Sequence, residues 1–139
     1  MPLLFSDDPE SMETAKKIIG GHIEAEPAEL ARIAQDKDVG KWPRIAAMYT
    51  LGFLGNRAFS PVLRHILADS SNDLDIRSYA AEALGNIGDQ DAAMLLKKVL
   101  RDVPPAALRE SCKYALEELE GSLGGATRLQ PQSVPPLPN

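Results

Sequence analysis

A motif that returns every thirty-two or thirty-three residues constrains the fold of this chain more than any other feature. The segment Leu51–Asn56 reads LGFLGN, and it returns at Leu84–Asp89 as LGNIGD. The positions that align across all three copies are Arg44, Arg77 and Arg109, then Ala47, Ala80 and Cys112, then Leu51, Leu84 and Leu116. Three copies in register predict one supersecondary unit that stacks on itself three times.

Each copy predicts two helices joined by a polar turn. The first helices are expected at 27–36, 59–69 and 90–102, and the second helices at 43–54, 75–87 and 105–120. Gly55 and Gly88 follow the second helices and suit a left-handed C-terminal stop. Ser60 and Asp91 lie near the starts of first helices, where their oxygens are expected to cap. Because one helix pair cannot bury both of its faces, the pairs must stack as an all-α fold, an α-α superhelix.

The repeats set the domain boundaries. We expect a flexible N-terminus at 1–8, a capping helix and linker at 9–26, and a disordered, Pro-rich tail at 121–139. Between them, residues 27–120 hold three helical-hairpin repeats, at 27–56, 57–89 and 90–120. The tail also matches a polyproline II ligand, but a soluble end is the more common meaning of such a composition.

One apolar stripe per helix predicts the core. In the middle copy, apolar residues recur at the spacing of a single helical face. The residues expected to form one continuous core are Leu51, Leu54, Leu63, Ile66, Ala80, Leu84, Ile87, Leu96 and Val99.

The second helix of the middle copy also carries a resemblance to a known family. Asp75-Ile76-Arg77-x-x-Ala80-Ala81-x-Ala83-Leu84-Gly85-x-Ile87-Gly88 resembles HEAT-like repeats, specifically the short bacterial HEAT repeats of the bilin lyase type. The resemblance covers roughly residues 27–120 and implies a HEAT/armadillo-like solenoid. It implies little about function, since such repeats occur in many unrelated scaffolds.

Composition narrows the partners and the compartment. The net charge of −5 argues against nucleic acid, and residues 1–40 carry all of it, with nine acids against four bases. A single cysteine, Cys112, excludes an internal disulfide. The sequence predicts neither a signal peptide nor a membrane span, so we expect a cytoplasmic protein that does not bind membranes.

No grouping of side chains in the sequence predicts catalysis or a metal. Related HEAT-like metal hydroxylases display repeated His-Glu pairs, whereas here His22 precedes Ile23 and His65 precedes Ile66. Cys112 aligns with a core alanine, which favours a small buried side chain over a nucleophile. The aligned arginines of the three copies favour bonds to the inter-helix turns over an anion-binding row. We therefore expect no cofactor, no metal and no enzyme activity.

One second helix differs from the other two. The helix at 43–54, with Trp42 directly before it, carries apolar residues on the side opposite its core stripe. These residues are Trp42, Ile45, Met48, Tyr49 and Phe53. The aligned residues are Asp75, Ser78, Ala81, Glu82 and Asn86 in the middle copy, and Ala107, Glu110, Lys113, Tyr114 and Glu118 in the last. A helix that is apolar on both sides is either covered on both or binds a partner. The alternative to a binding face is that the helix at 9–20 or the segment 23–27 covers the stripe.

From these patterns we predict a non-catalytic protein–protein interaction module, a scaffold or adaptor. It would bind another protein through its concave face, and most of all through the five residues of this stripe. The alternatives are an accessory subunit of an enzyme such as a bilin lyase-type chromophore transferase, and a homodimerising scaffold.

Overall fold

The computed structural model describes residues 9–19 and 26–123. Its helices are α1 (Pro9–Ile19), α2 (Pro27–Gln35), α3 (Lys41–Leu54), η1 (Arg57–Phe59), α4 (Ser60–Ala68), α5 (Leu74–Ile87), η2 (Gln90–Ala92), α6 (Ala93–Arg101) and α7 (Ala106–Leu123). The all-α fold and its three helix pairs are confirmed. The predicted N-terminus at 1–8 and most of the predicted tail lie outside the described residues. However, α7 continues to Leu123, past residue 120, where we had expected the tail to begin.

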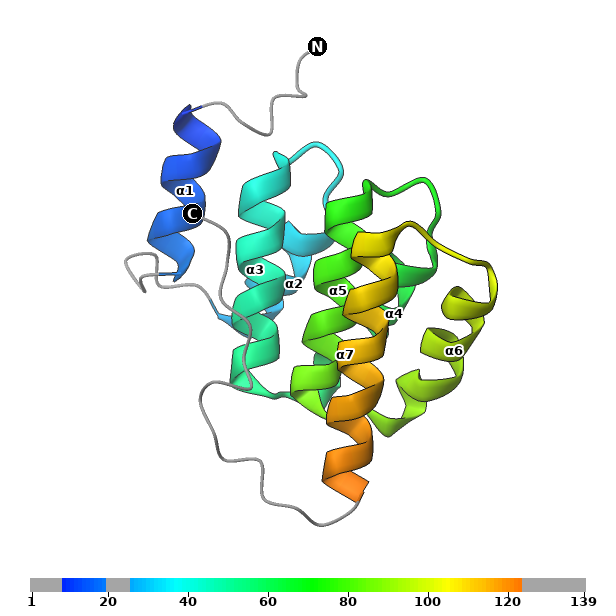
Figure 1. Ribbon diagram of the computed structural model, residues 1–139. Helices are drawn as coiled ribbons and strands as arrows, with labels where there is room; N and C mark the ends of the chain where they lie inside the picture. Colours follow the sequence, from blue (N-terminus) through cyan, green and yellow to red (C-terminus); the bar gives the residue numbers. More distant parts are fainter. Residues whose placement is uncertain (1–8, 20–25, 124–139) are drawn as a thin grey trace.

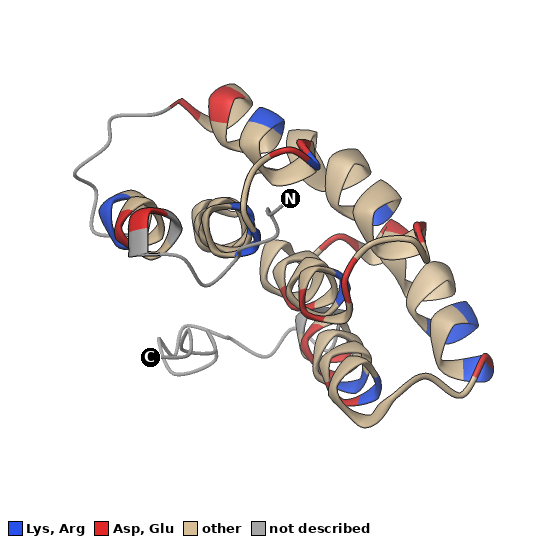
Figure 2. Cartoon of the chain, turned by 90° about the horizontal axis from the view of Figure 1, so that it is seen from above, with Lys and Arg blue, Asp and Glu red and all other residues tan. Residues whose placement is uncertain are grey.

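The helices form two rows that curve together. Helices α2, α4 and α6 form the outer row, and α1, α3, α5 and α7 form the inner row (Figures 1 and 2). The most extensive contacts within the inner row join α1 to α3, α3 to α5 and α5 to α7, and each outer helix packs on the next inner helix in the chain. Helix α1 therefore continues the row of second helices instead of standing apart from the stack. None of the described helices is long and apolar enough to cross a membrane.

The helix ends follow from local chemistry, with one difference from the predicted caps. Gly55 and Gly88 end α3 and α5 with φ of 73° and 81°, a left-handed conformation that glycine adopts without strain. The starts are capped by Asn56, Asp73 and Asp89, whose side chains each accept a hydrogen bond from the backbone two residues later. We had expected Ser60 and Asp91 in this role. The short helices η1 and η2 shift the capping residue upstream to Asn56 and Asp89.

The core lies between the two rows and consists mainly of apolar side chains, with a few buried polar groups such as Arg44 and Asp89. Eight of the nine predicted core residues are buried, Leu84 fully so, whereas Leu54 is 51% exposed and its placement in the core is wrong. The inner helices approach one another closely at small residues: a Cβ added to Gly52 would lie 3.0 Å from the Cα of Ala83, and one added to Gly85 would lie 2.7 Å from that of Ala115. Glycine is needed at these two positions because a side chain would meet the neighbouring backbone.

The aligned arginines bind carbonyls at the turns, as the structural interpretation predicts. Arg44 Nε donates to the Ala34 carbonyl at 2.8 Å, and Arg77 Nε donates to the Leu67 carbonyl at 2.9 Å. In the third copy, the Arg109 guanidinium donates to the Pro104 carbonyl at 3.1 Å. Each arginine thus satisfies a carbonyl at or beyond the end of an outer helix and fastens that end to the inner helix of its own pair.

Candidate functional site

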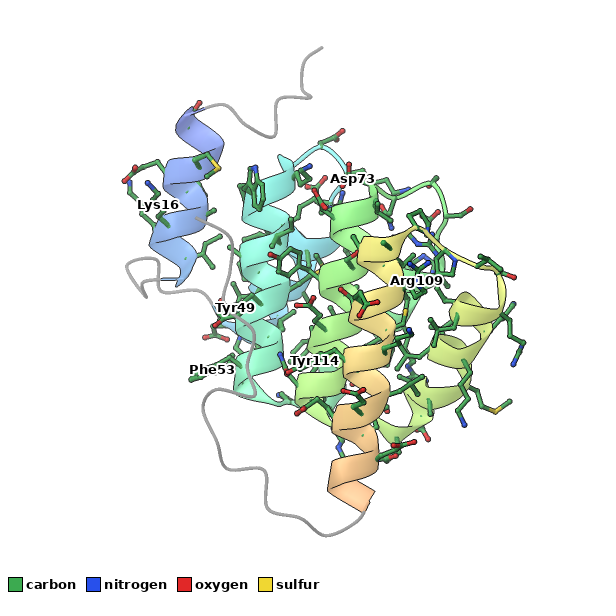
Figure 3. All side chains as sticks on the ribbon, in the orientation of Figure 1. Lys16, Tyr49, Phe53, Asp73, Arg109 and Tyr114 are labelled. Atoms are coloured by element: carbon green, nitrogen blue, oxygen red, sulfur yellow. The ribbon has the colours of Figure 1, made fainter. Side chains whose placement is uncertain are left out.

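The inner row of helices presents a half-buried face on the concave side of the curve, and its residues recur with the repeat. Figure 3 shows Tyr49 and Phe53 on α3 and Tyr114 on α7 along this row. By helical spacing, the inner-face positions are Trp42, Ala46, Tyr49 and Phe53 on α3, Asp75, Tyr79, Glu82 and Asn86 on α5, and Ala107, Ser111, Tyr114 and Glu118 on α7. Acidic, aromatic and amide side chains therefore meet at the centre of this face.

Glu82 is the central acid of the inner face. Its carboxylate accepts a hydrogen bond from Ser111 Oγ at 2.7 Å, which links α5 to α7. Burial raises the pKa of Glu82, and the Ser111 hydroxyl offsets this only in part. No charge of a nearby lysine or arginine contributes to the shift. Within 9–19 and 26–123, Glu82 is thus a half-buried carboxylate whose charge no lysine or arginine compensates.

Tyr79 lies close enough to this carboxylate to feel its charge. Desolvation, followed by the charges of Glu82 and Asp75, raises the pKa of Tyr79 to about 12, so its phenol stays protonated at neutral pH. On the other side, Tyr114 Oη donates to Asn86 Oδ1 at 2.5 Å. Asp75 is already paired, because Lys41 Nζ lies 2.9 Å from its Oδ2. The electrostatics of this face are therefore negative around Glu82, with polarisable aromatic rings beside it.

The five residues of the predicted stripe do not share one environment. Ile45 and Met48 are fully buried, Trp42 and Tyr49 are half-buried, and Phe53 is 67% exposed. Ile45 and Met48 lie between Lys41 and Gly52 on the side of α3 that packs against α5, as the contacts of Lys41 with Asp75 and of Gly52 with Ala83 show. A neighbouring repeat therefore covers part of the stripe, which neither of our two alternatives had considered.

Helix α1 meets another side of α3. Its Ala15 and Ile18 are buried. A hollow of about 340 Å³ remains between α1, α2 and α3, lined chiefly by Ile18, Ile33, Val39 and Pro43 with Glu10 and Thr14 at α1. Among the described residues that line the hollow, Glu10 is the only titratable one, so these residues supply no acid–base pair and no set of metal ligands.

The histidine and cysteine side chains do not assemble into a reactive site. His65 is exposed on α4 in the outer row, and His22 lies outside the described residues. Cys112 is fully buried, and burial raises the pKa of its thiol to about 11, which leaves it protonated and unreactive. Within 9–19 and 26–123, no group of three His, Cys, Asp or Glu side chains is placed to hold a metal ion.

The fold and its repeat define the class of protein. Residues 29–117 match the family described as HEAT repeats. The chain belongs to this family.

Particular relatives follow from the sequence and from the fold. The chain is 38% identical over 78 residues to deoxyhypusine hydroxylase of Saccharomyces cerevisiae, a match that covers 56% of this chain and 24% of that protein. It is 39% identical over 77 residues to deoxyhypusine hydroxylase-B of Oryza sativa subsp. japonica, covering 55% of this chain and 25% of that one. The structure of human deoxyhypusine hydroxylase in complex with glycerol superposes with a TM-score of 0.71 at 27% identity, covering 96% of this chain and 47% of that chain. The sequence matches thus span about a quarter of each relative, and the structural match spans about half.

These relatives correct the functional prediction. By name they are hydroxylases, so the prediction of a non-catalytic interaction module, and of a chain that is not an enzyme, is wrong. The sequence predicted no catalysis partly because it lacks His-Glu pairs, and the same absence argued against a metal hydroxylase. The HEAT-like part of the resemblance is confirmed, but the relatives found are hydroxylases and not bilin lyases.

The inner-face residues Tyr79, Glu82 and Ser111 were not among the predicted site residues. The signal for Glu82 was present in the repeat alignment, which places Tyr49, Glu82 and Tyr114 at one repeat position. A single carboxylate between two tyrosines at equivalent repeat positions indicates a site only once the helices that carry them are known to lie side by side.

Proposed function

We propose that this chain serves the hydroxylation of a deoxyhypusine-type side chain and holds the amine of that side chain against its inner face. The observation that carries the proposal is Glu82, a half-buried carboxylate whose charge is offset by no cation among the residues that the structure describes. A substrate cation at this place supplies the missing charge, and a charge-assisted hydrogen bond is stronger in a half-buried position than in water.

The similarity to deoxyhypusine hydroxylases supports the choice of substrate. The name of those relatives specifies a hydroxylase acting on deoxyhypusine, which is lysine extended by a chain that ends in an amine. Its secondary and primary amines are both protonated at neutral pH. Such a ligand suits a face that combines one carboxylate with aromatic rings, because ammonium groups bind both.

The geometry also supports a single orientation of the amine. Ser111 occupies Glu82 Oε2, which leaves Oε1 to accept from a ligand. Tyr79 remains a neutral hydroxyl and does not compete for the ammonium as a phenolate. Together Glu82 and Tyr79 would fix the amine of the substrate between α5 and α7. The rest of the deoxyhypusine side chain would extend along the concave face.

Isothermal titration calorimetry on the full chain tests this proposal with two peptides that differ only in one residue, deoxyhypusine or lysine. We expect the deoxyhypusine peptide to bind and the lysine peptide to bind more weakly. Glu82→Gln, which keeps the shape but removes the charge, should weaken binding of the deoxyhypusine peptide about tenfold or more.

The matched control is Glu110→Gln, which removes an exposed carboxylate from α7. This variant should bind both peptides as the wild type does. Equal affinity for the two peptides, or equal loss in the two variants, would show that the inner face attracts cations only through its general negative charge.

A further inference from the structure

We infer that this chain does not hold the metal of a hydroxylase through its own repeats, and that metal ligands for the reaction come from residues outside it. The inference rests on the proposed function, because only a hydroxylation reaction calls for this metal. Its evidence is the set of side chains in this chain that could bind a metal. The iron of a non-haem oxygenase is bound by imidazole and carboxylate ligands that converge on one point. The chain has two histidines, and neither is followed by a glutamate.

The described histidine is in the wrong row. His65 lies on α4, and α4 belongs to the outer row, whereas the candidate substrate site lies on the inner face. It is exposed, and its neighbour in sequence is the buried core residue Ile66. A metal at His65 would therefore be held on the convex side, away from Glu82.

The carboxylates that are near the inner face already have partners or stand alone. Asp75 pairs with Lys41, and Asp73 lies 3.8 Å from the same ammonium. Glu82 accepts from Ser111, and its raised pKa reports burial without a second charge beside it. Glu118 is a second half-buried carboxylate of this face, but no three His, Cys, Asp or Glu side chains of the described residues are placed to hold a metal ion. Such a face suits an organic ammonium better than a divalent cation, which needs several ligands at short range.

Metal titration of the full 139-residue chain, prepared without a histidine tag, tests this inference directly. Iron(II) and cobalt(II) are the probes, added under anaerobic conditions, and human deoxyhypusine hydroxylase is the positive control. We expect no stoichiometric metal after desalting, no cobalt ligand-field absorption band and no rise in melting temperature. A metal that binds only the folded protein must raise the melting temperature in proportion to its affinity.

Stoichiometric metal that survives desalting would overturn the inference. Repeating the titration with His22→Ala and His65→Ala then identifies which histidine is responsible. Loose metal that is removed by desalting and leaves the melting temperature unchanged supports the inference. The result is independent of the proposed function, because amine binding at Glu82 is measured in the absence of any metal.

Discussion

Glu82 shows how a single substitution within a repeat creates a candidate site. The repeat places an aromatic ring at this position in the first and third copies, Tyr49 and Tyr114, and a carboxylate in the middle copy. Helix α5 lies between α3 and α7 in the inner row, and Glu82 on it is half-buried. A carboxylate in that place costs folding free energy, which is the usual signature of a residue retained for binding and not for stability.

This cost predicts a pH dependence. Because the pKa of Glu82 is raised in the folded chain, the ionised carboxylate opposes folding, and its contribution becomes more unfavourable as the pH rises through that pKa. Glu82→Gln should therefore melt at a higher temperature than the wild type near neutral pH. The difference should shrink as the pH falls below about 4, where the carboxyl is protonated in both states. Melting curves of both proteins across this range measure it, and a difference that grows toward acid pH would contradict the burial of Glu82.

The core makes a second prediction at the residue scale. Leu84 is fully buried at the centre of α5, so Leu84→Ala should lower the free energy of unfolding by about 2–5 kcal/mol. The control is Met94→Ala on α6, where the side chain is 81% exposed and its removal should have little effect. Urea denaturation followed by circular dichroism gives both values. A Leu84→Ala variant as stable as Met94→Ala would mean that the repeat register is misassigned.

At the scale of the helix, the repeat predicted which segments are helical and which faces are buried, because the 3.6-residue period and the glycine stops are local properties. It did not predict the burial of every equivalent residue. Leu54 aligns with buried Ile87 but is exposed, since the first and middle copies have different neighbours. Within the predicted stripe, Ile45 and Met48 are buried because they lie on the side of α3 that packs against α5, whereas Phe53 is exposed. Which side of a helix meets the next repeat depends on the stacking, and one helix does not specify it.

Close contact between inner helices gives a prediction at this scale. A Cβ on Gly85 would lie 2.7 Å from the Cα of Ala115, so Gly85→Ala should force α5 and α7 apart. We expect a loss of about 1–3 kcal/mol in the free energy of unfolding, even though alanine favours helix more than glycine does. The nearest atom is a backbone atom of Ala115, so no change of side-chain rotamer can relieve the clash. Chemical denaturation of this variant measures the loss, and a stabilised Gly85→Ala would refute the close approach.

Gly52→Ala provides the matched comparison, since its Cβ would lie 3.0 Å from the Cα of Ala83. The gap is slightly larger, so the loss should be smaller than in Gly85→Ala. Moreover, Gly85→Ala should weaken amine binding as well as stability, because it moves Ser111 away from Glu82. Gly52→Ala leaves this pair in place and should not weaken binding.

At the scale of the whole molecule, the chain is a curved stack whose inner face carries a negative, aromatic-lined centre. It matches 47% of the human hydroxylase chain and lacks the His-Glu pairs of related metal hydroxylases. The sequence predicted the solenoid because repeats report architecture, but it could not predict the enzyme relatives. Repeats of this kind occur in proteins of unrelated function, and the His-Glu pairs expected to mark the chemistry are missing from this chain. We therefore propose that the chain is the substrate-binding part of a hydroxylating assembly, with the metal held by residues outside the chain.

The most direct test of this account is hydroxylation by the assembly that contains this chain. The chain is captured from its native host with its partners, and the deoxyhypusine peptide is added with dioxygen and a reductant. Mass spectrometry should show the peptide gaining one oxygen atom, and capture through Glu82→Gln should retain the partners but lose most of this product. Full product formation with the Glu82→Gln chain, or none with the wild-type assembly when its metal is present, would contradict the central claim.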